Sequence, residues 1–363
     1  MDHDQRRIGI LTGGGDCPGL NAVIRAVVKA ATKRGWHTFG VLGGFEGLLE
    51  PVRLRRLDYQ EMGALLTQGG TILGTSNRGR FAAKTGRGEV HRIPDEILDE
   101  AKRNLAKEGL SALVCVGGDG SLTIAQQLFE AGVPVVGVPK TIDNDLEATV
   151  MTFGFDSAVE CATHALDRLH TTAESHSRVM VLEVMGRSAG WIAISAGISG
   201  GGDVILIPEI PFRYEQVCAK IAEREKSGRH FTLVVVAEGA QPLGGDLVTQ
   251  GPAAGDREVR LGGVGAAVAS EIERRTGKEV RVCVLGHLQR GGGPTSFDRL
   301  LCTRFGVMAV ELAAEGKFGH MVTLRPPVTQ AVKITEAIGR IRRVPLDGDL
   351  VRTARALGIS LGD

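Results

Sequence analysis

The sequence predicts an α/β fold of two similar domains, each built around a mostly parallel sheet. Three observations lead to this expectation. Short apolar runs alternate with amphipathic segments, which is the pattern of parallel strands joined by crossover helices. The alternation restarts near residue 150. Glycine-rich or charged loops follow the apolar runs in both halves of the chain.

In the first half, strands and helices are expected to alternate along the chain. A helix over 94–109 has a proline and acidic residues at its start and a glycine at its end. A helix over 21–35 has apolar residues at helical spacing and also ends in glycine. The expected strands with their loops cover 7–16, 37–44, 111–121 and 133–145, and a third helix covers 122–132.

The second half repeats the pattern. Strands with their loops are expected over 178–186, 203–209, 231–240 and 281–292, and helices over 214–228 and 264–277. We therefore place a first domain at 1–154, to which 289–345 return. The second domain covers 155–288, and 346–363 form a C-terminal tail.

Length and composition agree with this organisation. The chain has 363 residues, more than one hydrophobic core commonly accommodates. Hydrophobic residues make up 43% and charged residues 23%, as in ordinary soluble globular proteins. The net charge of +1 gives no basis for binding nucleic acid or an anionic membrane. The 51 glycines favour tight turns and close approach of the backbone to a ligand.

The six cysteines indicate a reducing compartment. None belongs to a C-x-x-C pair or has zinc-like spacing to histidine, and several lie inside apolar runs. The N-terminus leads directly into an apolar strand without a signal peptide. No apolar run is long enough to span a membrane. We therefore expect a cytoplasmic protein.

Two glycine-rich loops are candidates for binding phosphate. "TGGGDCPGLN", Thr12–Asn21, exposes backbone N–H groups between a strand and a helix. It matches neither standard nucleotide motif, and a plain tight turn is the alternative. "GGDGS", Gly117–Ser121, adds Asp119, which suits Mg²⁺ beside phosphate oxygens or, alternatively, a helix cap.

The other loops at strand ends carry charged side chains. Lys140, Asp143 and Asp145 follow a buried strand, which indicates either an Asp/Asn turn or a catalytic loop beside a reacting hydroxyl. Arginine suits bidentate binding of phosphate, and a carboxylate can accept a hydrogen bond from a sugar hydroxyl. Surface charge and salt bridges are the alternatives. Such residues in the second half are Arg178, Arg187, Glu238, Arg281, His287 and Arg290.

Taken in order, "GGGDCPGLN", "GGDGS", "PKTIDND", "MGRSAGW" and "GHLQRGG" resemble the 6-phosphofructokinases, from about residue 6 to about residue 345. The resemblance implies two Rossmann-like domains with the active site in the cleft between them. The first domain would bind ATP and Mg²⁺, and the second would bind the sugar phosphate. The implied reaction is transfer of a phosphoryl group from ATP to O1 of fructose 6-phosphate, the committed step of glycolysis.

The resemblance also implies residue roles. Asp143 resembles the general base for the O1 hydroxyl, with Thr141 and Arg187 at the transferred phosphoryl group and Asp145 nearby. The donor site would comprise Gly14, Gly15, Gly118, Asp119 (also the Mg²⁺ contact), Gly120 and Ser121, with Arg78 beside the adenine. The sugar-phosphate site would comprise Thr141, Ile142, Asp143, Arg178, Met185, Gly186, Arg187, Glu238, Arg281, His287, Leu288, Gln289 and Arg290.

Oligomerisation follows from the same resemblance. In the family, two arginines of the 6-phosphate clamp come from a neighbouring subunit, and the matching residues are Arg178 and Arg281. We therefore expect a homodimer or homotetramer.

Two positions bear on the phosphoryl donor. Gly120 matches the ATP enzymes, whereas Lys140 matches the pyrophosphate-dependent relatives. An aspartate at 120 would repel the α-phosphate of ATP, but a lysine at 140 excludes neither donor. ATP is therefore the predicted donor, with pyrophosphate as the alternative and a non-catalytic sugar-phosphate sensor as a third reading. Trp191 in "MGRSAGW" departs from the usual bacterial ATP enzymes, and the chain resembles the mixed-substrate group of the family, with Gly120 in GGDG and Lys140 before TIDND.

Overall fold

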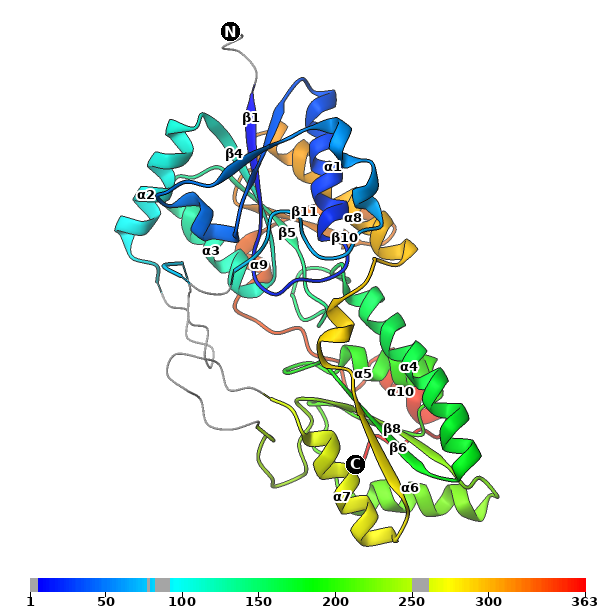
Figure 1. The fold of residues 1–363 in the computed structure, drawn as a ribbon. Coiled ribbons are helices and arrows are strands. Elements are labelled where there is room, and N and C mark those ends of the chain that lie inside the picture. Colours follow the sequence, from blue (N-terminus) through cyan, green and yellow to red (C-terminus); the bar gives the residue numbers. More distant parts are fainter. Residues whose placement is uncertain (1–5, 77–78, 82–91, 250–260) are drawn as a thin grey trace. The chain divides into compact units, whose positions relative to one another are not determined.

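The computed structural model describes residues 6–76, 79–81, 92–249 and 261–363 (Figure 1). The chain forms two compact units, and both are α/β with mostly parallel sheets, as predicted. The first unit comprises Met1–Ile142, Leu146–Ser157 and Arg290–Arg340. The second comprises Asp143–Asp145, Ala158–Gln289 and Ile341–Asp363. The short excursion Asp143–Asp145, which belongs by its contacts to the second unit, had no counterpart in the expected boundaries.

The first unit is built on a seven-stranded sheet. Its strands are β1 (Arg7–Thr12), β2 (His37–Val41), β3 (Leu54–Leu57), β4 (Leu110–Gly117), β5 (Val135–Pro139), β10 (His320–Arg325) and β11 (Val328–Lys333). Their order is β11-β10-β5-β4-β1-β2-β3. Neighbouring strands are parallel except at the two edges, where β11 and β3 pair antiparallel.

Helices cover both faces of this sheet (Figure 1). On one face, α1 (Leu20–Lys33) packs against α8 (Ser296–Ala314). Gly306 allows their close approach, because a Cβ atom there would lie 2.6 Å from Cβ of Ala26. On the other face lie α2 (Asp95–Lys107), α3 (Asp119–Glu130) and α9 (Ile334–Ala337). Short 3₁₀ helices cover Gly44–Leu48, Tyr59–Met62 and Ala64–Leu66.

The second unit has a four-stranded parallel sheet with the order β7-β8-β6-β9. Its strands are β6 (Val179–Val184), β7 (Val204–Leu206), β8 (Thr232–Ala237) and β9 (Val280–Val284). Helices α4 (Phe155–His176), α5 (Trp191–Ser199) and α10 (Asp349–Ala356) gather on one face, and α6 (Tyr214–Lys226) and α7 (Val264–Thr276) on the other (Figure 1). A 3₁₀ helix, η4, covers Gly286–Arg290.

The chain order of the first sheet reverses between β1 and β4. β1 leads through α1 to β2 on one side, whereas β4 leads through α3 to β5 on the other. Ligands of doubly wound sheets bind outside the strand ends at such a switch point. The loops after β1 and β4 are the two glycine-rich loops, so the topology marks them as a binding site independently of their composition.

The predicted elements are present with small differences at their ends. The elements without a prediction are β3, α4, α5, α8, α9, α10 and the β10–β11 hairpin. α8 lies between α1 and the strands β5, β10 and β11, so its apolar residues do not form one stripe.

In the part of the chain that the structure describes, no helix is long and apolar enough to cross a membrane. All six cysteines are free thiols. Cys17, Cys115 and Cys302 are buried, and burial raises the pKa of each thiol. These three behave as the small buried hydrophobes that the sequence predicted.

A buried carboxylate joins the first turns of α4 and α8. Asp298 is fully buried, and Ser157 donates both its N–H (2.9 Å) and its hydroxyl (2.6 Å) to Asp298 Oδ2. Beside it, the Thr295 hydroxyl donates to Asp156 at 2.6 Å. Burial raises the pKa of Asp298 to about 6, although the bonds from Ser157 lower it. The folded chain therefore holds this proton more tightly than the unfolded chain does.

We predict that the free energy of unfolding falls as the pH rises from about 4 to about 6. Between about pH 4 and pH 6 the unfolded chain loses the Asp298 proton first, so the free energy of unfolding should fall by up to about 3 kcal/mol. Asp298→Asn should lack this component of the slope, whereas the exposed control Asp347→Asn should keep it. Urea unfolding at several pH values measures both slopes. Equal slopes for wild type and Asp298→Asn would contradict the assignment.

Candidate active site

The two glycine-rich loops meet at the side chain of Ser121. A Cβ atom on Gly13 would lie 2.7 Å from Ser121 Oγ, and one on Gly117 would lie 2.2 Å from Ser121 Cβ. Gly14 has a φ of 77°, in the left-handed region that favours glycine. The Gly13 N–H donates to the Val116 carbonyl at 2.9 Å, which extends the β1–β4 pairing into the loops. The loops therefore form a single glycine-lined cradle at the start of α3.

Asp119 is the first residue of α3, and its carboxylate lies half-buried beside this cradle. The helix cap is Gly118, so the alternative reading of Asp119 as the cap is wrong. Instead, the Gly339 N–H donates to Asp119 Oδ1 at 2.8 Å. Burial raises the pKa of Asp119, and the bond from Gly339 lowers it. A carboxylate beside a phosphate cradle is the kind of oxygen ligand that Mg²⁺ takes.

Two cationic side chains lie against Gly15 in the same cradle. Lys140 is 5% exposed, and its Nζ donates to the Gly15 carbonyl at 2.5 Å. A Cβ atom on Gly15 would lie 1.7 Å from Arg290 Nη1, so the guanidinium packs directly on the loop. The structure brings Arg290 beside the glycine loop, and its predicted role with His287 at the sugar 6-phosphate stays a prediction. The cradle thus combines backbone amides with two positive charges.

Hydrogen bonds hold a neighbouring segment, residues 68–75, beside the cradle. The Thr75 hydroxyl donates to the Gly14 carbonyl at 2.6 Å. Asn21, fully buried, donates its side-chain amide to two carbonyls of the segment at 3.0 and 3.3 Å. Arg78, predicted beside the adenine, lies outside the described residues.

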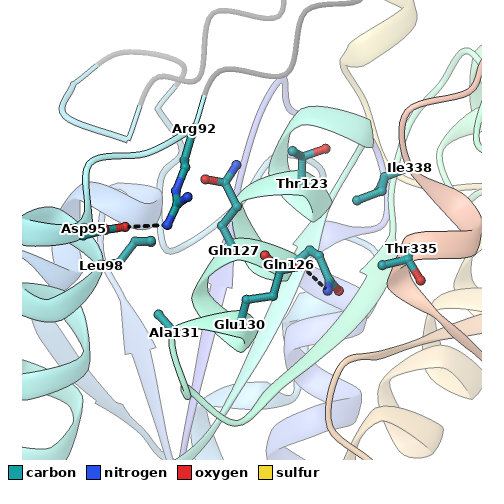
Figure 2. Close-up of a pocket in the computed structure, with 10 residues that line it drawn as sticks. All are labelled: Arg92, Asp95, Leu98, Thr123, Gln126, Gln127, Glu130, Ala131, Thr335 and Ile338. Atoms are coloured by element: carbon teal, nitrogen blue, oxygen red, sulfur yellow. Dashed lines mark hydrogen bonds and ion pairs between the residues drawn. The ribbon is translucent and has the colours of Figure 1, made fainter.

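A pocket of about 480 Å³ lies along α3 (Figure 2). Thr123, two residues after Ser121, is one of its lining residues. It is lined by Arg92, Asp95, Leu98, Thr123, Gln126, Gln127, Glu130, Ala131, Thr335 and Ile338. The Arg92 guanidinium pairs with Asp95 at 3.1 Å, and Gln126 donates to Glu130 at 2.9 Å (Figure 2). Its volume is that of a typical small-molecule site. Ile338 on its wall precedes Gly339, which binds Asp119, so the pocket and the cradle share a wall segment.

In the second unit, the loops after β6 and β8 lie side by side. The two strands are parallel and in register, with Val184 opposite Ala237. The Gly239 N–H donates to the Gly186 carbonyl at 3.2 Å, and a Cβ atom on Gly239 would lie 1.9 Å from the Arg187 carbonyl. Glycine at 239 is what lets the two loops touch. The predicted residues Arg187, exposed, and Glu238, half-buried, therefore stand at the same sheet end.

The loop after β9 joins this sheet end. The buried Gln289 accepts a hydrogen bond from the Met185 N–H at 3.3 Å, which ties η4 to the Arg187 loop. His287 is exposed, and Leu288 is 69% exposed. Met185, Gly186 and Gln289 are thus brought together, and the exposed side chains of η4 face outward beside them.

Asp143 stands in a tight turn rather than in a continuation of β5. Asn144 has a φ of 52°, a left-handed conformation that asparagine adopts more readily than most residues. Arg342 holds the turn twice: its Nη1 donates to the Asn144 carbonyl at 3.0 Å, and its backbone N–H donates to the Asp145 carbonyl at 2.8 Å. Before the turn, Ile142 is buried. The turn is thus anchored to the C-terminal segment of the second unit.

Arg178 and Arg281 lie at the opposite end of the strands from Arg187. Arg178 precedes β6, and Arg281 is the second residue of β9, next to Met180. Both bind Glu279: Arg178 Nε lies 2.8 Å from its carboxylate, and Arg281 pairs with its other oxygen. Within one chain, this pair is therefore separated from the Arg187 loop by the length of β6.

The sequence did not predict the parts played by Gly339, Glu279 and Arg342. Each acts through a partner far away in the sequence or through a backbone group, and none belongs to a recognisable motif. For Arg342, the sequence did offer its partner: Trp191, noted there as a departure from the usual bacterial ATP enzymes. The Trp191 indole N–H donates to the Arg342 carbonyl at 2.8 Å.

A glycine-lined cradle at a topological switch point, with two cations and a carboxylate, has the kinds of group with which α/β proteins bind phosphate. The family model for phosphofructokinase matches residues 7–313. The chain belongs to the phosphofructokinase family.

Relatives carry two different names. The ATP-dependent 6-phosphofructokinase of Chloroflexus aurantiacus is 52% identical over 100% of this chain and 99% of its own length. The pyrophosphate–fructose 6-phosphate 1-phosphotransferase of Amycolatopsis methanolica is 50% identical over 93% of this chain and 96% of its own length. Phosphofructokinase from Pichia pastoris matches in structure with a TM-score of 0.79 and 31% identity, over 93% of this chain. This chain spans only 36% of that much longer one.

We predict that Gly117→Ala disrupts the cradle. Its new Cβ atom would lie 2.2 Å from Ser121 Cβ, so the start of α3 must move, at a cost of about 1–3 kcal/mol. The matched control is Gly63→Ala, which meets nothing within 4 Å and has helical backbone angles. That control should leave stability unchanged or raise it slightly. Denaturant unfolding measures both variants, and equal stabilities would contradict the packing described.

Proposed function

We infer that the chain transfers a phosphoryl group from ATP to O1 of fructose 6-phosphate, as a glycolytic 6-phosphofructokinase in the cytoplasm. The observation that carries this proposal is the cradle of Gly13–Asp16 and Gly117–Ser121, with Lys140 and Arg290 against Gly15 and the pocket continuing along α3. Phosphoryl transfer needs positioning and neutralisation of charge more than covalent participation by the protein. These groups supply both.

The roles are those that the resemblance to the 6-phosphofructokinases implies, and the chemistry of each side chain supports them. Asp143 takes the proton of the O1 hydroxyl as the hydroxyl oxygen attacks the phosphoryl group. Thr141 lies beside that hydroxyl. Arg187, exposed at its strand end, stabilises the negative charge that develops on the transferred group. Glu238 accepts a hydrogen bond from a sugar hydroxyl. Asp119 would hold Mg²⁺, which would supply positive charge to neutralise the phosphates of the donor.

The pocket along α3 favours ATP over pyrophosphate as the donor. Its volume of about 480 Å³ would accept a nucleoside, and pyrophosphate has no group to fill it. Gly120 adds no charge or volume at the second position of α3. The names of the relatives also favour ATP: ATP-dependent 6-phosphofructokinases are 52% identical over 99–100% of this chain, and the pyrophosphate-dependent relative is 50% identical over 93%. The choice therefore rests on these relatives, on the pocket and on Gly120.

A second copy of the chain would complete the sugar-phosphate site. Arg178 and Arg281 form a pair on Glu279 at the far end of the strands from Arg187, which suits donation to a neighbouring subunit. β9 is an edge strand with exposed apolar side chains, Val282 at 38% and Val284 at 53%. Such an edge favours association of copies in a homodimer or homotetramer.

The experiment that tests the function is a donor comparison. Purified protein with Mg²⁺ and fructose 6-phosphate receives ATP or pyrophosphate, and fructose 1,6-bisphosphate is measured. We expect turnover with ATP and far less with pyrophosphate. A preference for pyrophosphate would overturn the donor assignment. Binding of the sugar phosphate without turnover on either donor would support a sensor instead.

Asp143→Asn tests the general base. The amide keeps the shape of the side chain but cannot take a proton, so kcat should fall by about 10²- to 10⁴-fold. The KM for fructose 6-phosphate should change far less, because the phosphate contacts remain. Glu147→Gln, in the same segment but outside the turn, is the control and should retain kcat. Near-normal kcat in Asp143→Asn would mean that another group takes the proton.

Gly120→Asp tests the donor gate. A carboxylate about 4 Å from a phosphate costs about 4 kcal/mol near a protein surface, which corresponds to roughly a 10³-fold loss with ATP. Weak turnover with pyrophosphate should appear, since Lys140 is already in place. Gly120→Ala separates size from charge and should lose much less. Steady-state kinetics with both donors measures these effects, and comparable ATP rates in wild type and Gly120→Asp would remove Gly120 as the gate.

A further inference from the structure

The C-terminal segment of the second unit forms a clamp on the turn that carries Asp143. Three groups of Arg342 take part. Its guanidinium Nη1 donates to the Asn144 carbonyl at 3.0 Å. Its backbone N–H donates to the Asp145 carbonyl at 2.8 Å, and its own carbonyl accepts the Trp191 indole N–H at 2.8 Å. One residue thus connects the Asp143 turn to the first residue of α5.

Trp191 also holds the guanidinium itself. The Arg342 guanidinium carbon lies 4.3 Å from the centroid of the Trp191 ring, within the range of a cation–π contact. Trp191 is 8% exposed, so the stacked pair is largely screened from water. A guanidinium confined on a ring loses less conformational freedom when it donates to a carbonyl than a freely rotating one does. The ring therefore directs the Arg342 donor at Asn144.

Glu209 fastens the two sides of the clamp together. Its carboxylate accepts the Gly190 N–H at 3.0 and 3.1 Å, and the Val344 N–H at 2.8 Å. Gly190 precedes Trp191, and Val344 follows Arg342 by two residues. The start of α5 and the segment around Arg342 are therefore fixed to each other independently of the ring. A Cβ atom on Gly190 would lie 2.4 Å from Ile207, so only glycine fits there.

We propose that Arg342, stacked on Trp191, is a positioning residue that holds the Asp143 turn in register with the Arg187 loop. The proposal rests on the function given above, in which Asp143 is the base and Arg187 stabilises the transferred group. The turn needs such a support because Asn144 is 2% exposed and left-handed, a conformation that surrounding contacts must maintain. Trp191 begins the helix that directly follows the Arg187 loop. Arg342 thereby fixes the positions of both the Asp143 turn and the Arg187 loop.

The variant Arg342→Met tests this role, with Arg343→Met as the matched control, because Arg343 is the exposed neighbour. In Arg342→Met, loss of this charged hydrogen bond should lower kcat by about 10- to 100-fold. The KM values for ATP and for fructose 6-phosphate should change little. Arg342→Lys, which keeps the charge without the planar fork, should fall between wild type and Arg342→Met. Trp191→Phe keeps a ring and loses the N–H, and should cost less than Arg342→Met. A normal kcat in Arg342→Met would overturn the proposal.

A double-mutant cycle distinguishes positioning from general destabilisation. If Arg342 acts through Asp143, then Arg342→Met should cost little more in an Asp143→Asn background. A purely structural role would give losses that multiply, and that result would contradict the proposal.

A third readout does not depend on activity. Amide hydrogen exchange over residues 143–145 should be faster in Arg342→Met than in Arg343→Met. The fluorescence of Trp191, recorded in a Trp36→Phe background, should change in Arg342→Met only. Unchanged exchange and fluorescence would overturn the clamp even if the enzyme were active. If wild type transferred no phosphoryl group, the proposed function would fail, while these two measurements would still decide whether Arg342 holds the turn.

Discussion

The parallel pairing of β1 with β4 is the constraint on which the first unit's site depends. The two strands pair up to Thr12, the last residue of β1, which lies opposite Val116, so their loops emerge side by side. Because β1 leads to β2 on one side and β4 leads to β5 on the other, the point between these two strands is the switch point of the sheet. Ser121 fills the remaining space so closely that Gly13 and Gly117 can have no side chain. The concentration of glycine is therefore a packing requirement as well as a means of presenting backbone amides.

In the second unit too, neighbouring parallel strands bring their loops together. Here the loops carry charged side chains. The loops after β6, β8 and β9 are joined through backbone groups of Gly186, Gly239 and Met185, and Arg187 and Glu238 lie at the same sheet end. Rigid strands thus set the spacing of the loops, and the loops carry the chemistry. The Asp143 turn is the exception. It is set by hydrogen bonds from a distant segment, and its geometry consequently depends on Arg342.

How much the sequence could predict differed between the fold and the site. Alternating strands and helices, and the loops at strand ends, followed from local patterns, because each pattern is short and periodic. α8 escaped prediction because it packs on several sides at once. The contact of Asp119 with Gly339 and that of Asn144 with Arg342 link residues about 200 positions apart through backbone groups. A backbone carbonyl or N–H has no signature in the sequence, so these contacts needed the folded chain. Arg290 shows the same limit, since its place beside Gly15 depends on the return of the chain after η4.

We propose that the amides of Gly13–Gly15 and Gly118–Ser121 bind the phosphates of the donor. Amide hydrogen exchange, measured with and without Mg²⁺ and a non-hydrolysable ATP analogue, tests this binding. We expect slower exchange in these two loops, with further protection along α3 where the pocket lies. Protection that appeared elsewhere and left both glycine loops unchanged would contradict it.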